Sequence, residues 1–210
     1  MSRTDAVEIN DLILTFSGDD WLGLSQAERV ARRWRIEVLR TIWSDDDDSG
    51  GEEQIVIGRG SATVIDIDDA ADAGVPVWDV FDMISSETEH LYGVYDEADG
   101  WWDEDLGLAV VSSTALFLET LSLDPPYRGL GLGPPILAGI IDRLASGCSF
   151  AALEPHPFGE PFGGKTIEEA TRSLERLWGG LGFEPFRNGV WVLDLGTTVF
   201  SARRKEIFGR

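Results

Sequence analysis

A glycine-rich stretch is the part of this sequence whose residues and spacing best indicate chemistry. Residues 127–133 are Tyr-Arg-Gly-Leu-Gly-Leu-Gly, directly before an apolar helical pattern that begins at Pro134. Alternate glycines let successive backbone amides turn toward one point, and the start of a helix adds partial positive charge. Arg128 can add a full positive charge. The stretch predicts a phosphate-binding loop, in which each charge-assisted hydrogen bond contributes about 1.5–3 kcal/mol. A purely structural glycine loop is the alternative.

Two common phosphate motifs fit this loop poorly. A P-loop ends in Gly-Lys-Ser/Thr, whereas Gly133 is followed by Pro134. The dinucleotide fingerprint needs a glycine three residues after its second one, and Gly131 is instead followed by Gly133. A nucleotide-binding protein of another kind stays open as a weaker interpretation.

The loop is flanked by elements that would position it. The apolar run 115–123 predicts a strand, which ends at Asp124 because Pro125 and Pro126 cannot continue a β-ladder. Pro134 and Pro135 suit the first turn of a helix, where amide protons have no helical partner. Further elements are expected as a helix over 134–145, a strand over 150–153, a helix from the Thr166–Glu169 capping box to Gly179, a strand over 190–195 and, as a weighed addition, a strand over 197–200.

The first half of the chain gives a second set of expectations. Ser25 and Glu28 resemble a capping box, and the apolar spacing that follows predicts a helix to about Trp43. The arginines of this segment are expected on a solvated, ion-paired face. The other expected elements are a strand over 11–16, an exposed acidic loop over 45–53, a long strand over 54–67 with a bulge near Gly58 and Gly60, a helix over 76–91, an acidic turn over 96–105 in which Trp101 and Trp102 anchor a lid on the core, and a strand-like run from 106 to about 111.

With these elements in place, the loop resembles that of the GNAT superfamily of N-acyltransferases. The family pattern is Arg/Gln-x-x-Gly-x-Gly/Ala after the fourth strand, and Arg128, Gly131 and Gly133 match it. The preceding residues 121–125 are similar to the family's strand end and turn, and 177–183 are similar to its helix end and Leu-Gly-Phe sequence. The similarity extends over about 116–195.

The resemblance implies a fold and a co-substrate. It implies one α/β domain over 1–210, with a mixed central sheet, splayed fourth and fifth strands and helices on both faces. It also implies that acetyl-CoA binds with its pyrophosphate on the loop and its pantetheine arm along the fourth strand. The residues so implied are Leu121, Leu123, Arg128, Gly129, Leu130, Gly131, Leu132 and Gly133, with Trp178 packing against the pantetheine or the core. Pro134 removes one amide donor from this set.

Acyl transfer to an amine needs a base, and Glu119 is the first candidate. It lies four residues before Leu123, and some small-amine acetyltransferases of the family carry a glutamate at the matching place. Glu119 is expected to act through water; an exposed strand glutamate is the equal alternative. Glu154 and His156 are reserve candidates.

The proton donor for the leaving thiolate is the main departure from the family. Many members have a tyrosine four residues before the glycine of Leu-Gly-Phe, and this position is Trp178 here. Because an indole cannot supply that proton, Tyr127 or water serves, or the thiolate leaves unassisted, or catalysis has been lost.

The charge of the chain is unevenly distributed. The formal net charge is −21, and residues 1–105 hold 27 acids and 7 bases, whereas 106–210 hold 11 and 10. We therefore divide the chain into an acidic, acceptor-side half (1–105) and an acyl-CoA-binding half (106–200). The charge predicts a cationic acceptor, either a small amine or a basic protein amine; simple solubility is the alternative. Such a charge argues against nucleic acid as a partner.

Composition narrows the remaining classes. No apolar stretch approaches the roughly 18 residues of a membrane helix, and residues 1–20 lack a secretory pattern, so a cytoplasmic protein without a membrane partner is expected. The single Cys148 excludes an intrachain disulfide and a cysteine-rich metal site, and it is expected to be a buried apolar residue. No metal is expected, and a homodimer stays open.

The sequence thus supports two functions. The first is a GNAT-type N-acetyltransferase that transfers an acetyl group from acetyl-CoA to an amine. The alternative is a catalytically impaired acyl-CoA-fold module that binds a basic protein through its acidic half.

Overall fold

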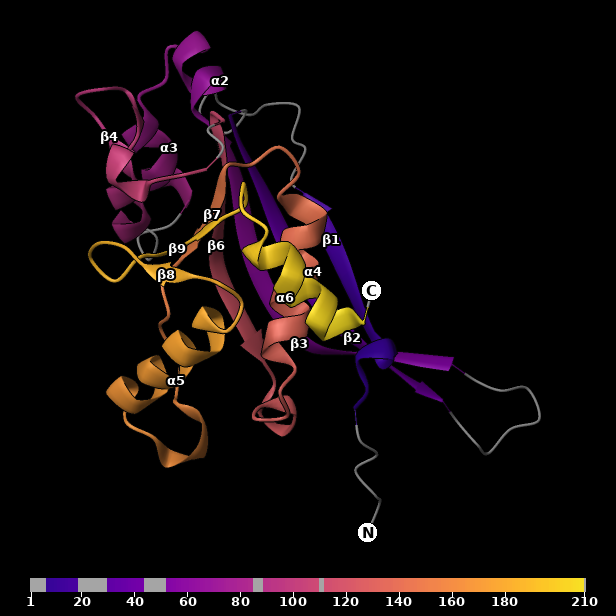
Figure 1. The fold of residues 1–210 in the computed structure, drawn as a ribbon. Helices are drawn as coiled ribbons and strands as arrows, with labels where there is room; N and C mark the ends of the chain where they lie inside the picture. The colour runs from indigo at the N-terminus through magenta and orange to yellow at the C-terminus, as the bar shows by residue number, and fades with distance from the viewer. Residues whose placement is uncertain (1–6, 19–29, 44–51, 85–88, 110–111, 210) are drawn as a thin grey trace.

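A mixed seven-stranded sheet organises the protein, which is described here from a computed structural model (Figure 1). The structure describes residues 7–18, 30–43, 52–84, 89–109 and 112–209. The strand order is β1-β2-β3-β6-β7-β9-β8. The strands are β1 (Leu12–Gly18), β2 (Ala31–Trp43), β3 (Glu52–Asp66), β6 (Thr114–Leu123), β7 (Phe150–Leu153), β8 (Glu184–Pro185) and β9 (Trp191–Asp194). Among the strand pairs formed by these residues, β6–β7 is parallel and the others are antiparallel.

The helix predicted to run to Trp43 is wrong over 31–43, where the chain forms β2. Its apolar residues recur every four positions, and a spacing of four also falls on one face of a strand because strands alternate every two residues. The exposure pattern shows this alternation: Ile36 and Val38 are buried, whereas Arg35 and Glu37 between and beside them are exposed. The proposed capping box lies at 25–28, outside the described residues.

Helices and cores lie on both faces of the sheet. One core packs under α4 (Gly133–Leu144), the end of α5 (Ile167–Gly179) and α6 (Val199–Phe208), and takes Leu116 and Leu118 from β6. The other core takes the alternate residues Ala115 and Phe117. α6 replaces the strand weighed over 197–200, and its helix begins directly after Thr198.

The second core lies under a cap formed by residues 67–84 and 89–109, which we call the acidic cap. It contains α2 (Ile67–Asp72), α3 (Val77–Ile84), a 3₁₀ helix (Glu89–Val94) and the hairpin β4 (Tyr95–Asp96) and β5 (Trp101–Trp102). Trp102 is buried against Phe117 and Phe150, which confirms the prediction that this tryptophan anchors a lid. No strand forms over 106–109, where a strand-like run was predicted; a 3₁₀ turn (Glu104–Leu106) precedes these residues instead.

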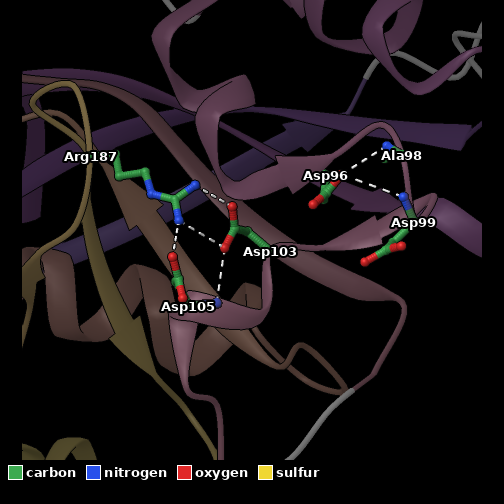
Figure 2. A network of polar contacts seen from close by, with 6 residues as sticks. All are labelled: Asp96, Ala98, Asp99, Asp103, Asp105 and Arg187. Atoms are coloured by element: carbon green, nitrogen blue, oxygen red, sulfur yellow. Dashed lines mark hydrogen bonds and ion pairs between the residues drawn. The ribbon is translucent and has the colours of Figure 1, made fainter.

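Arg187 joins the acidic cap to the turn between β8 and β9. Figure 2 shows its guanidinium directed at Asp103 and Asp105, with one Nη2–Oδ1 contact to Asp103 of 3.2 Å. Asp96 in the same view accepts hydrogen bonds from the amides of Ala98 and Asp99, which closes the hairpin turn. The cap is thus fixed to the C-terminal strands by charge as well as by its core.

The predicted elements around the glycine loop are confirmed. β6 ends at Leu123, a 3₁₀ turn (Pro125–Tyr127) follows, and α4 begins at Gly133. Thr166 and Glu169 form the predicted reciprocal capping box at the start of α5. In the described part of the chain no helix is long and apolar enough to cross a membrane.

Candidate functional site

The loop between β6 and α4 has an unusual backbone conformation. Gly129 and Gly131 have φ values of 74° and 77°, a left-handed conformation that glycine adopts without a steric penalty. Within the described residues, none of the amides from Gly129 to Leu132 donates to a backbone carbonyl. Four successive donors directly before a helix form a site suited to an anion.

Arg128 has a different role from the one its charge suggested. Its Nε donates to the carbonyl of Leu123 at 2.6 Å, and its Nη1 donates to the carbonyl of Glu160 at 3.4 Å. The side chain therefore ties the loop to the end of β6 and to the segment after β7. Its charge remains beside the loop, but two of its nitrogens are used in holding the backbone.

A groove of about 440 Å³ opens beside this loop. Its walls come from the end of β6, the loop, the start of α4, α5 and the segment 156–165. Of the cofactor-binding residues predicted from sequence, the groove is lined by Leu121, Leu123, Arg128, Gly129, Gly131, Leu132, Gly133 and Trp178. Leu130 is the exception, because it is exposed and does not line the groove.

Sequence reasoning missed the part of the groove wall that comes from the segment between β7 and α5. Phe158, Phe162 and Lys165 line the groove from the segment that joins β7 to α5. A Cβ atom added to Gly129 would lie 3.0 Å from the ring of Phe162, so this segment packs closely on the loop. Its proline- and glycine-rich sequence indicated only a connection, although the two phenylalanines were an available signal.

β6 and β7 separate beside the groove. They pair from Ala115–Phe150 to Leu118–Leu153, and β6 then continues to Leu123 without a partner from β7. A small cavity of about 40 Å³ lies at this separation, and the groove shares with it Leu121, His156, Phe158, Leu174 and Trp178. The two spaces therefore adjoin, and the small cavity forms the inner end of the groove.

Glu119 lines the small cavity from a β-bulge. Ala62 pairs with Leu118 and Ser61 with Thr120, so Glu119 has no partner on β3. Its side chain is 2% exposed, with Oε2 3.0 Å from Nη2 of Arg33 and Oε1 accepting from the Thr63 hydroxyl. The exposed-glutamate alternative is excluded, and two donors hold the carboxylate in one position.

The other candidate groups divide between the two spaces. Glu154 and His156 line the small cavity, whereas Tyr127 lines only the groove. Trp178 lines both and is 8% exposed; its ring lies about 3.4 Å from where a Cβ on Gly133 would be. Arg33, which holds Glu119, was expected only as part of a solvated helical face. In the described residues, no group of three or more His, Cys, Asp or Glu side chains is arranged to hold a metal ion.

Comparisons with known proteins give no match. Neither protein-family models, nor curated proteins, nor solved structures resemble this chain significantly.

Proposed function

We propose that this protein is a GNAT-type N-acetyltransferase that transfers an acetyl group from acetyl-CoA to an amine. The observation that carries the proposal is the pair of adjoining spaces. Together they run from four loop amides that donate to no backbone carbonyl of the described residues, along the part of β6 that does not pair with β7, to the buried carboxylate of Glu119.

The sheet supports the proposal. β6 and β7 are the fourth and fifth strands across the sheet, and they are its parallel pair and the pair that separates. A separated strand edge leaves backbone groups that can pair with an extended ligand, as in strand addition. The pantetheine arm, with its amide groups, is such a ligand, and the groove of about 440 Å³ has room for it.

Each part of the site then has a chemical role. The amides of 129–132 hold the pyrophosphate, and the backbone of Leu121 orients the thioester near the small cavity. Glu119 takes a proton from the acceptor amine, directly or through one water. The hydroxyl of Thr63 and the guanidinium of Arg33 fix its carboxylate, whose oxygens keep further lone pairs to accept that proton.

Among the described residues, neither Trp178 nor Tyr127 is suited to protonate the departing thiolate. Trp178 lines the small cavity, and its indole N–H is a hydrogen-bond donor but not an acid that could give a proton to sulfur. Tyr127 lines the outer groove and does not line the small cavity. Water or unassisted departure of the thiolate therefore completes the reaction.

A second function follows from the same residues. With both carboxylate oxygens of Glu119 already accepting hydrogen bonds, and with Trp178 in the inner groove, the chain would bind acyl-CoA without turning it over. The acidic cap would then serve as the surface for a basic partner.

The deciding experiment is release of free thiol from acetyl-CoA across a panel of amines and basic peptides, with Glu119→Gln as the test variant. The introduced amide side chain keeps an oxygen for Arg33 and an N–H donor for Thr63 but cannot act as a base. We expect turnover by the natural chain and a loss of about 10²–10⁴-fold in the variant.

Calorimetry with acetyl-CoA separates the outcomes. Binding with no thiol release would favour the noncatalytic function. Undiminished turnover by Glu119→Gln would remove Glu119 as the base. Binding of NAD or ATP in preference to acetyl-CoA would overturn both functions.

A further inference from the structure

The charged side chain nearest Glu119 is the cation Arg33, although residues 1–105 as a whole are strongly acidic. Most described acids of residues 1–105 lie on the acidic cap, in its helices, its hairpin and its 3₁₀ segments. Next to the cap, on the same face of the sheet, the strands β1, β2 and β3 present a surface that we call the open sheet face. The charged side chains nearest Glu119 therefore belong to the open sheet face and not to the acidic cap.

The strand registers define the open sheet face. One row across the sheet contains Ser17, Arg35, Ser61 and Thr120, and the next contains Thr15, Glu37, Arg59 and Ser122. Arg33 and Thr63 form the row nearest the cap. The exposed side chains on the two outer strands show that no described element covers them, and Arg33 is 46% exposed.

The small cavity reaches this face. Ser61, Glu119 and Thr120 line it, and the hydroxyls of Ser61 and Thr120 lie 2.9 Å apart across β3 and β6. A ligand on the open sheet face can therefore place an atom at the inner end of the groove, beside Glu119.

The ion pair at this point joins a buried anion to a half-exposed cation. Only Nη2 of Arg33 contacts Glu119, and the other guanidinium nitrogens make no hydrogen bond to a described residue. A guanidinium has five N–H donors in a planar fork that suits a carboxylate. A ligand here meets one negative and one positive group, whose nearest atoms are 3.0 Å apart.

Resting on the proposed function, we propose that the acceptor is an α-amino acid, with its amine at Glu119 and its carboxylate on Arg33. Standard bond lengths place the amine nitrogen and the carboxylate oxygens of such a molecule about 3 Å apart. Both protein charges then keep an opposite partner. A polyamine would be repelled by the positive charge of Arg33. An amine without a carboxylate would leave the remaining N–H donors of Arg33 without an anionic partner.

The inference replaces the cationic acceptor that net charge suggested. That expectation used the average over 105 residues, whereas recognition depends on groups within a few ångströms of the reacting nitrogen. The acids of the cap dominate the net charge of residues 1–105, whereas Arg33 is the charged group next to Glu119.

The test measures thiol release from acetyl-CoA with three matched pairs: L-leucine and leucinamide, L-alanine and alaninamide, and L-lysine and lysinamide. Spermidine serves as the polyamine. We expect kcat/KM to be about 10- to 100-fold higher for each acid than for its amide, which corresponds to one charge-assisted contact. Equal use of the amides, or preferred use of spermidine, would overturn the inference while leaving the acetyltransferase proposal intact.

Variants assign the preference to Arg33. Arg33→Gln keeps a donor for Glu119 but removes the charge, and it should bring the acid-to-amide ratio close to one. Arg33→Lys should retain part of the ratio because it keeps the charge without the fork. Arg59→Gln is the matched control: Arg59 lies on the same face but pairs with Glu37, at 3.6 Å, whereas Arg33 pairs with Glu119. An unchanged ratio in Arg33→Gln would overturn the assignment.

A binding measurement keeps the inference testable if no amine releases thiol. Saturation-transfer NMR of L-leucine against leucinamide, with the natural chain and Arg33→Gln, reports recognition without transfer. Preferential binding of the acid that depends on Arg33 would support the inference even though acetyl transfer had failed. Absence of that preference would refute it.

Discussion

The two faces of the central sheet are completed in different ways. On one face, α4, α6 and the end of α5 pack on an aliphatic core, and the groove is lined by two stretches of the second half of the chain, within 121–134 and 156–178. On the other, the acidic cap packs through aromatic rings over part of the sheet, and the open sheet face beside it is polar. The proposed donor site thus comes from residues 121–178, whereas the proposed acceptor site combines Arg33 and Glu119, which lie 86 residues apart.

Replacement of Trp102, at the centre of the aromatic core under the cap, is expected to cause the largest loss of stability. Trp102 packs edge-on against Phe150, with ring centroids 5.1 Å apart, and its Nε1 donates to the carbonyl of Ser112 at 2.9 Å. Trp102→Ala should lower the free energy of unfolding by about 3–5 kcal/mol. Urea denaturation measures this loss.

A second tryptophan of the cap is the control. Trp78 in α3 is 53% exposed, so Trp78→Ala should change the free energy of unfolding by no more than about 0.5 kcal/mol. Equal losses in the two variants would mean that the cap has no core of its own. Acetyl-CoA binding by folded Trp102→Ala should persist if the two faces act separately.

The reactivity of Cys148 tests how well the aliphatic core on the opposite face excludes solvent. Cys148 follows α4 and packs partly buried against the aliphatic core, and burial raises the pKa of its thiol to about 11 from 9.0. At pH 8 this lowers the thiolate fraction, and with it the alkylation rate, by about 100-fold. Because the folded pKa is the higher one, the stabilising effect of the protonated thiol is present below pH 9 and is lost as the pH rises toward 11.

Iodoacetamide labelling followed by mass spectrometry measures this rate. The same protein in urea, where the thiol is solvated, is the reference. Native and unfolded rates that agree at pH 8 would show that this end of the aliphatic core is open to solvent.

These two faces also differ in how far the sequence predicted them. The strand end, the loop and α4 are specified by local signals, namely Pro125 and Pro126, the alternate glycines, and the prolines of the first turn of α4. The capping box at Thr166 specifies the start of α5 in the same way. The open sheet face was missed because the four-residue spacing of Trp34 and Val38 suits a helix and a strand alike. Once β2 was mistaken for a helix, the contact between Arg33 and Glu119, 86 residues apart, could not be inferred.

Backbone conformation in the loop gives a smaller, more specific test. Gly131 has a φ of 77° and open space where a Cβ would lie, so Gly131→Ala is disfavoured by conformation alone, by about 1–2 kcal/mol. The backbone should relax and spoil the convergence of the amides, raising the Kd for acetyl-CoA about tenfold or more. Calorimetry measures the Kd, and urea denaturation measures stability.

Gly147 offers a matched control for that variant. Its φ is 85°, no atom lies within 4 Å of the position that a Cβ would take, and it does not line the groove. Gly147→Ala should therefore reduce stability by a similar amount with no change in the Kd. A Kd raised equally by both substitutions would indicate general destabilisation and count against the loop as the pyrophosphate site.

The smallest expected effect concerns the link between the cap and the C-terminal strands. Arg187 contacts Asp103 and Asp105, and the side chain of Asp103 is only 10% exposed (Figure 2). Arg187→Met keeps much of the side-chain length but leaves the Asp103 carboxylate without its cation, which destabilises the folded state. We expect the Tm to fall by about 2–4 °C.

An exposed pair elsewhere separates this link from ordinary surface charge. Arg203 pairs with Glu206 within α6, and both side chains are about half exposed or more. Arg203→Met should leave the Tm nearly unchanged, because an exposed ion pair is weak and screened by salt. If Arg187→Met lowers the Tm no further than Arg203→Met, the cap is held by its aromatic core alone. If it lowers the Tm further and the deficit persists in high salt, the nearly buried Asp103 carboxylate is the cause, because salt screens buried pairs much less than exposed ones.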